Sequence, residues 1–269
     1  MVGVNGALTK LSLAHNRLEK EGTKAICEAL KQNKTLKELD LSGRAIGGEA
    51  GAKHVADMLG VNGGLTRVDV RRNNIAGDGA AQLAAAVLGN LKIEMFNEIP
   101  IKEMRANSLT ELDLKGKDVG VEGVMVVAGL IPVMGGLTKI SLAQNKLEEE
   151  GTKAICEALE QNKTLKELDI SGNVYGSNIG GSAGVKHVAK MLGVNGGLTS
   201  LDLSSNQLCG LDRYGRGTYT AEGITAIADA LRVNGALTNI DLSHNWLGAE
   251  GAAALAPALA ANGVLTKIK

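Results

Sequence analysis

The sequence is poor in aromatic side chains, which make up 2% of its 269 residues. Compact domains commonly rely on large aromatic anchors in their cores, so this scarcity argues against a single globular core. No run of about 18 consecutive apolar residues is present, which gives no candidate for a membrane-spanning helix. We therefore expect no membrane partner.

The chain also lacks an excess of either charge, with 29 basic and 29 acidic residues. A balanced chain has no overall attraction to polyanions, so we expect no nucleic-acid partner. The three cysteines, Cys27, Cys156 and Cys209, are odd in number and far apart, which fits reduced thiols better than a disulfide framework. The N-terminus "MVGVNGALTK" has no signal-peptide pattern, so the sequence predicts a cytoplasmic protein.

The common catalytic motifs are missing too. The sequence contains no phosphate-binding G-x-x-x-x-G-K-[ST] loop, no C-x-x-C pair and no H-E-x-x-H. No two histidines have metal-ligand spacing. We predict a protein without catalytic residues, metal or cofactor.

Glycine is abundant, with 36 residues, and it accompanies an internal repeat with a period of about 28 residues. The repeat starts at equivalent leucines, and one further start at Leu265 is cut short. The full starts are "LTKLSLAHNRL" at Leu8, "LKELDLSGRAI" at Leu36, "LTRVDVRRNNI" at Leu65, "LTELDLKGKDV" at Leu109, "LTKISLAQNKL" at Leu137, "LKELDISGNVY" at Leu165, "LTSLDLSSNQL" at Leu198 and "LTNIDLSHNWL" at Leu237.

Within each repeat, the spacing of the apolar residues changes from that of a strand to that of a helix. In "LKELDL", Leu39 and Leu41 alternate with polar residues, as in a strand with one buried face. After the strand, apolar residues recur at helical spacing, for example at Val126, Val127 and Leu130. The pattern predicts one strand and one helix per repeat, which must stack on neighbouring repeats to bury their apolar faces.

Two sets of asparagines punctuate the repeats. One set follows the strands and is expected to hydrogen-bond to neighbouring loop backbones: Asn16, Asn73, Asn145, Asn173, Asn206 and Asn245. The other set closes the helices and is expected to form left-handed C-caps: Asn33, Asn62, Asn162, Asn195, Asn234 and Asn262.

The eight full repeat starts follow the pattern L-x-x-L-x-L-x-x-N-x-L. In this pattern the chain resembles the leucine-rich repeat proteins of the ribonuclease-inhibitor-like class, which includes NOD-like receptors and Ran GTPase-activating protein. The resemblance implies an α/β solenoid of about nine units shaped as a horseshoe, with a parallel sheet on the concave face and helices on the convex face. We expect residues 1–269 to form a single solenoid. Because neither end resembles a polar cap, with "GVNGALT" at the start reading as the close of a preceding unit, we expect a fragment of a longer array.

A block of this array occurs twice. "EGTKAICEALKQNKTLKELDLSG" at Glu21 and "EGTKAICEALEQNKTLKELDISG" at Glu150 differ at only two positions, Lys31/Glu160 and Leu41/Ile170. The whole block, residues 8–64, corresponds to residues 137–197. Shared positions are scaffold, so the differences carry the information about function.

Three segments depart from the repeat: residues 91–108, read as an irregular unit whose Phe96 fills the core, and loop insertions at 174–178 and 209–220. The two insertions follow consecutive strands and should be adjacent on one rim. They hold all three tyrosines, and the only tryptophan lies at the next strand edge. Since Tyr, Trp and Arg often carry binding energy, we predict a partner-binding patch, with loop packing as the alternative. The patch comprises Tyr175, Arg213, Tyr214, Arg216, Tyr219 and Trp246.

A second candidate lies on the concave face, where aspartates occupy one equivalent outward position. This acidic stripe suits a basic partner surface, although "LDLS" is also ordinary solvated scaffold in such repeats. The stripe comprises Asp40, Asp69, Asp113, Asp169, Asp202 and Asp241.

These features predict a non-catalytic protein–protein interaction scaffold that binds a macromolecular partner through its concave face and strand-to-helix rim. The resemblance leaves two alternatives open: a GTPase-activating protein of the Ran-specific type, and the ligand-sensing tail of a NOD-like receptor. The motif match concerns the scaffold alone and transfers no catalytic residue.

Overall fold

The computed structural model describes residues 6–173 and 175–269, which fold into two compact lobes. The N-terminal lobe comprises residues up to 108 together with 117–130, and the C-terminal lobe comprises 109–116 and 131–269. One solenoid over residues 1–269 stays a prediction. Residues 3–5 of the expected partial unit and residue 174 of the expected 174–178 insertion lie outside the described residues.

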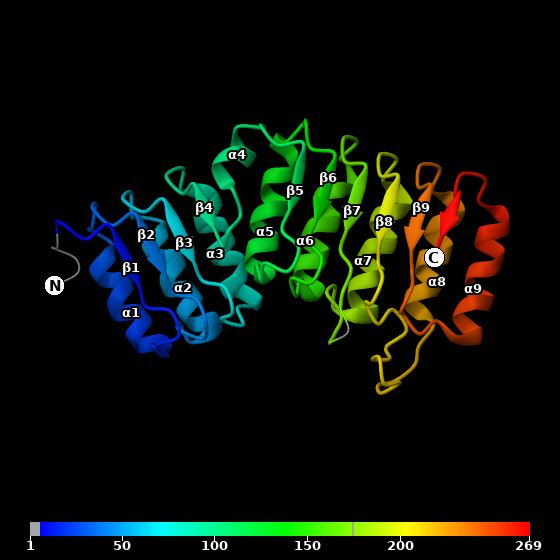
Figure 1. Ribbon diagram of the computed structural model, residues 1–269, viewed down its shortest axis with the longest axis horizontal. Helices are drawn as coiled ribbons and strands as arrows, with labels where there is room; N and C mark the ends of the chain where they lie inside the picture. Colours follow the sequence, from blue (N-terminus) through cyan, green and yellow to red (C-terminus); the bar gives the residue numbers. More distant parts are fainter. Residues whose placement is uncertain (1–5, 174) are drawn as a thin grey trace. The chain divides into compact units, whose positions relative to one another are not determined.

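In the N-terminal lobe, strands and helices alternate along the chain and the strands form one parallel sheet in the order β1-β2-β3-β4. The elements are β1 (Lys10–Ser12), α1 (Glu19–Leu30), β2 (Glu38–Asp40), α2 (Gly48–Leu59), β3 (Arg67–Asp69), α3 (Gly77–Gly89), β4 (Met95–Phe96), α4 (Ile101–Arg105) and α5 (Gly120–Leu130). Figure 1 shows the helices of this lobe on one side of its sheet.

The C-terminal lobe repeats the plan with a second parallel sheet, in the order β10-β9-β8-β7-β6-β5. Its elements are β5 (Glu111–Asp113), η2 (Ile131–Val133), β6 (Lys139–Ser141), α6 (Glu148–Glu160), β7 (Glu167–Asp169), α7 (Gly181–Val194), β8 (Ser200–Asp202), α8 (Glu222–Val233), β9 (Asn239–Asp241), α9 (Gly248–Ala261) and β10 (Lys267–Ile268). Nine α-helices and ten strands in the described residues confirm the predicted α/β solenoid of about nine units.

Equivalent repeat positions pair in register, which explains why the pattern folds this way. Leu39 pairs with Val68, and Leu168 with Leu201. These apolar strand residues are buried, so equivalent positions of successive repeats contribute apolar side chains to the core of each lobe.

The asparagine ladder after the strands is confirmed at four positions. Each of these buried side chains donates from Nδ2 to a strand-end carbonyl of the preceding repeat, at 2.8 to 3.0 Å. The donors are Asn73, Asn145, Asn206 and Asn245, and the acceptors are Leu41, Leu114, Ile170 and Leu203. In the first repeat, Asn16 is exposed and donates to Ala14 within its own loop.

The prediction for Asn173 is wrong, because Asn178 takes the ladder position in its repeat. The Asn178 Nδ2 donates to Leu142 O at 2.9 Å, and its Oδ1 accepts from Asn145 N at 2.8 Å. Because the insertion lengthens the loop, it moves the ladder position from residue 173 to residue 178. Asn173 instead accepts a hydrogen bond from Tyr175 N.

The prediction of left-handed helix C-caps is also wrong. Asn195, Asn234 and Asn262 are extended, with φ near −77° and ψ near 117°. Each side chain bridges two repeats: Asn195 Nδ2 donates to Leu159 O at 2.6 Å, and its Oδ1 accepts from Leu198 N at 2.8 Å. Contacts between repeats therefore override the local preference of an Asn-Gly pair.

The irregular unit 91–108 contains the two-residue strand β4 and the five-residue helix α4. Phe96 is fully buried, as expected. Arg105 of α4 ties the unit to the preceding helix by donating to Val87 O and Leu88 O, each at 3.0 Å.

Candidate functional site

The insertion between β8 and α8, residues 209–220, folds back as a short antiparallel hairpin. Leu211 and Gly217 form a bridge, and Asp212 N donates to Arg216 O at 2.9 Å. A Cβ at Gly217, where φ is 123°, would lie 2.2 Å from Gly210 O, so glycine is required for the close approach of the two arms. Figure 1 shows the hairpin extending beyond the neighbouring loops of the C-terminal lobe.

Asp212 organises the tip of this hairpin. Its Oδ1 accepts hydrogen bonds from Tyr214 N and Arg216 N, each at 2.9 Å. Its Oδ2 accepts from the Arg216 guanidinium at 2.7 Å, and this hydrogen bond lowers the pKa of Asp212 below its ordinary value. The charge of Arg216 is therefore compensated within the hairpin.

Arg213 joins the two insertions. Its guanidinium carbon lies 4.5 Å from the ring centre of Tyr214 and 5.9 Å from that of Tyr175. It also donates to the Tyr214 hydroxyl, and Arg216 covers the same ring at 4.8 Å. Cation–π attraction of this kind holds a guanidinium in place without neutralising its charge.

Tyr175 is presented by its own small turn. Asn173 and Gly176 form an antiparallel bridge, and Asn173 Oδ1 accepts from Tyr175 N at 2.8 Å. Tyr175 is 89% exposed, and Tyr214 is 63% exposed. The cluster of Tyr175, Arg213 and Tyr214 therefore lies on the surface.

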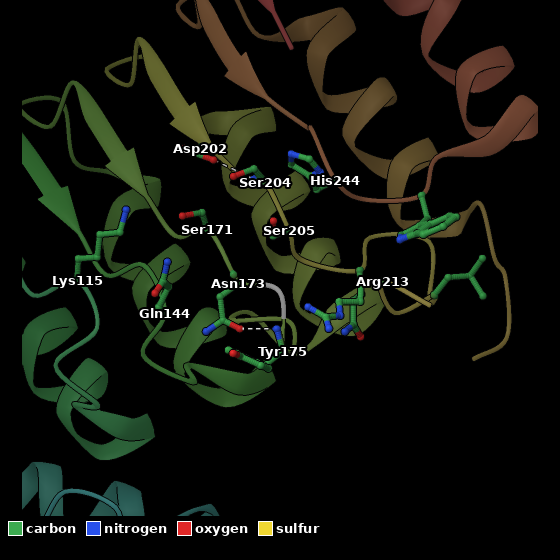
Figure 2. Close-up of a pocket in the computed structure, with 14 residues that line it drawn as sticks. Lys115, Gln144, Ser171, Asn173, Tyr175, Asp202, Ser204, Ser205, Arg213 and His244 are labelled. Carbon is green, nitrogen blue, oxygen red and sulfur yellow. Dashed lines mark hydrogen bonds between the residues drawn. The ribbon is translucent and has the colours of Figure 1, made fainter. Parts of the chain in front are cut away.

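The cluster borders a groove of about 770 Å³ in the C-terminal lobe, which we call the rim groove. Its lining combines the two insertions with residues that follow strands of the sheet. The lining includes Lys115, Gln144, Tyr175, Asp202, Arg213 and Trp246. Figure 2 shows Lys115 and Arg213 at opposite sides of the groove, with Asn173 between them.

The structure divides the predicted patch into three groups, the third of which is Tyr219 alone. Tyr175, Arg213 and Trp246 line the rim groove, and Trp246 is 48% exposed. Tyr214 and Arg216 are outside the groove lining: Tyr214 contacts Arg213, and Arg216 covers the ring of Tyr214.

Tyr219 lies elsewhere and fastens the base of the hairpin. Its hydroxyl donates to Leu247 O at 2.6 Å and accepts from Gly251 N at 3.1 Å. The hairpin is therefore anchored to the start of α9.

Sequence reasoning missed several groove residues, among them Lys115, Gln144, Ser204 and His244. They occupy the two variable positions between the last apolar strand residue and the asparagine position of successive repeats. Aligning those two positions across the repeats is the signal that identifies them.

The aspartates of the acidic stripe pair in register within each sheet, Asp40 with Asp69 in one lobe and Asp169 with Asp202 and Asp202 with Asp241 in the other. Every one also accepts a hydrogen bond from the backbone N–H two residues further on, at 2.9 to 3.0 Å. The stripe therefore has a structural role in closing the turns after the strands.

Two of these carboxylates, Asp40 and Asp241, have pKa values that differ from the ordinary value. Burial alone raises the pKa of Asp40, but hydrogen bonds from Ser42 and Ser12 and the charge of Arg71 outweigh it, so the pKa lies below its ordinary value. The pKa of Asp241 is lowered in the same way, against desolvation, by Ser243 and Lys269. Both are charged at neutral pH.

The described residues, 6–173 and 175–269, contain neither a metal-ligand cluster nor a membrane-spanning helix. No group of three or more His, Cys, Asp or Glu side chains among them is arranged to hold a metal ion. No helix within 6–173 or 175–269 is long and apolar enough to cross a membrane.

Comparison with protein families finds repeated matches along the chain. A model described as leucine-rich repeat matches residues 7–27, 32–53, 65–84, 161–177 and 236–256, and a second leucine-rich repeat model matches residues 197–215.

Among curated proteins, the chain is 28% identical over 202 residues to human NACHT, LRR and PYD domains-containing protein 13, covering 75% of this chain and 17% of that protein. It is 28% identical over 228 residues to the ribonuclease inhibitor of Sus scrofa, covering 75% of this chain and 46% of the inhibitor. The chain thus spans less than half the length of either relative. A solved structure, the leucine-rich repeat-containing protein LegL7 of Legionella pneumophila, aligns with 98% of this chain and 83% of its own, at 18% identity and a TM-score of 0.42.

Proposed function

Because the chain is a leucine-rich repeat protein of the ribonuclease-inhibitor-like class, we propose that it is a non-catalytic scaffold that binds a protein partner. The partner contacts the strand-to-helix rim and the adjoining sheet face of the C-terminal lobe. The observation that carries the proposal is the rim groove, where Tyr175, Arg213 and Trp246 come from different repeats and line one surface.

The composition of this surface supports binding. Tyr, Trp and Arg provide most of the energy at many protein interfaces, and all three tyrosines and the only tryptophan of this chain belong to the predicted patch. The hairpin that carries Arg213 is fixed by its own hydrogen bonds and by Tyr219, so little conformational entropy is lost when a partner binds.

The chain supplies a regular loop with which to test the proposal. Replacing residues 209–221 by Gly-Ala makes the segment after Asn206 read Gln-Leu-Gly-Ala-Glu-Gly, whose last five residues match Leu247–Gly251. This variant removes the hairpin while keeping the repeat pattern of a neighbouring unit, and a cooperative thermal transition confirms that it folds.

Peptides are selected from a display library on the intact chain and then tested on the hairpin-replaced variant and on Tyr175→Ser. We expect the selected peptides to lose binding to both. The matched control is Leu91→Ser, which removes an exposed apolar side chain of the N-terminal lobe that is 79% accessible. Peptides that bind the hairpin-replaced variant as well as the intact chain would show that the groove is not the binding surface.

A further inference from the structure

The groove contains a guanidinium whose charge the protein leaves uncompensated. Arg213 is held by two aromatic rings and by the Tyr214 hydroxyl, and within the described part of the chain it forms no ion pair. Its neighbour Arg216 differs, because Asp212 binds its guanidinium at 2.7 Å. An exposed guanidinium with free N–H groups in a fixed orientation is suited to bind a carboxylate.

Lys115 is a second cation of this kind, at the opposite side of the groove (Figure 2). Its backbone N–H is bonded to Asp113, whereas its ammonium makes no ion pair with any residue that the structure describes. Other lysines of the same lobe are paired, such as Lys139 with Glu167 at 3.2 Å and Lys269 with Asp241 at 3.2 Å.

The one acid in the groove lining, Asp202, uses its Oδ1 to accept from Ser204 N at 2.9 Å. Two cations against one carboxylate leave the groove positive. The aspartates next to it, Asp169 and Asp241, would repel a polyanion such as a nucleic acid along the whole sheet face. The charges therefore favour a ligand with one or two separate acidic groups over a uniformly charged chain.

The remaining lining is rich in hydrogen-bonding groups that suit a peptide backbone. Gln144, Ser171, Asn173, Ser204 and Ser205 all border the groove. Trp246 adds an aromatic surface for a neighbouring side chain.

We propose that the rim groove binds an extended peptide segment of the partner, whose acidic side chain pairs with Arg213 and whose second acidic group lies near Lys115. This assignment rests on the proposed function and specifies the chemistry of the partner. The Tyr175 and Tyr214 rings orient the Arg213 guanidinium, so it binds the acidic side chain of the partner at one position.

The test uses two display libraries of equal peptide length, one without Asp and Glu and one without Lys and Arg. Only the second should yield peptides that require the 209–220 hairpin. Hairpin-dependent peptides from the acid-free library would overturn the acidic partner while leaving the binding scaffold intact. If neither library yields hairpin-dependent peptides, the proposed function itself fails.

A selected acidic peptide and its Glu→Gln counterpart are then titrated against the chain, with the fluorescence of Trp246, the only tryptophan, as the readout. Arg213→Gln should weaken binding of the acidic peptide at least tenfold, Lys115→Gln about threefold, and the Glu→Gln peptide should be insensitive to Arg213→Gln. Arg72→Gln, which removes an exposed arginine of the N-terminal lobe, is the matched control and should change nothing. Equal loss of both peptides on Arg213→Gln, or tighter binding of a single-stranded oligonucleotide of the same length, would overturn the proposal.

Discussion

The two lobes share one repeat pattern and differ in what their rims do with positive charge. In the N-terminal lobe, Arg71 pairs with Asp69 at 2.7 Å and with Glu98 at 2.9 Å, and Lys117 pairs with Glu98 at 3.3 Å. In the C-terminal lobe, Arg213 and Lys115 have no such partners among the described residues and border the rim groove. The same scaffold thus holds Arg71 and Lys117 in ion pairs in one lobe and presents Arg213 and Lys115 to a partner in the other.

The lobes also differ in the burial of an acid near the start of a helix. In the N-terminal lobe the carboxyl of Glu122 in α5 is buried and accepts a hydrogen bond at 3.0 Å from Asn97 Nδ2 of the irregular unit. Equivalent acids in the second lobe, Glu222 and Glu250, are exposed. Desolvation by burial raises the pKa of Glu122 to about 8.

The largest effect is therefore expected from Glu122→Gln. Between pH 4.5 and about 8 the folded chain retains the Glu122 proton while the unfolded chain has lost it, so the native chain loses stability as the pH rises through this window. The total loss is at most ~5 kcal/mol. The glutamine variant should match the native chain near pH 4 and exceed its stability by up to this amount at pH 9, as measured by urea unfolding across pH.

The control for that measurement is Glu222→Gln, the same change at an exposed acid that pairs with Lys186. Its pKa is lowered by this partner, so the change should give a small loss at neutral pH that disappears in acid. A stability curve for Glu122→Gln that runs parallel to that of the native chain would contradict the buried, protonated carboxyl.

The second prediction concerns the duplicated block, in which Ala45 of the first copy corresponds to Asn178 of the second. Asn178→Ala restores the residue of the first copy but leaves Asn145 N and Leu142 O without their buried partner. We expect a loss of about 3 kcal/mol in the free energy of unfolding, because buried polar groups are left unsatisfied.

Asn173→Ala is the matched comparison within the same loop. It removes one hydrogen bond, to Tyr175 N, at a partly exposed site, so thermal and urea unfolding should show a loss below about 1 kcal/mol. Equal losses for the two variants would show that the ladder does not run through residue 178.

Comparison with the sequence shows which inferences a repeat supports. The strand–helix order, the buried leucines and the ladder asparagines Asn73, Asn145, Asn206 and Asn245 follow from a pattern that constrains every copy at once. The pattern fails where an insertion changes the register, as with Asn178, and where a neighbouring repeat overrides a local preference, as with the extended asparagines that close the helices.

The candidate site, like the fold, is predicted from the sequence only in part. Tyr175 and Arg213 are singled out by their place in loop insertions and Trp246 as the only tryptophan of the chain, and all three line one groove. The inward anchoring of Tyr219 and the contribution of Lys115 depend on contacts between distant repeats, which residue type alone does not reveal.

The smallest expected effect comes from breaking ion pairs in the N-terminal lobe, so that its cations become available as Arg213 and Lys115 are. Glu98→Gln removes the acid shared by Arg71 and Lys117 and should cost less than about 1 kcal/mol, because the pairs are partly exposed. In an Arg213→Gln background, where the rim groove is disabled, this change should raise the affinity for a labelled acidic peptide about twofold to fivefold, measured by fluorescence anisotropy. Glu103→Gln makes the same change in net charge at an exposed acid of α4 and is the control. If both variants raise the affinity equally, net charge alone is responsible, and internal ion pairing is not what distinguishes the two rims.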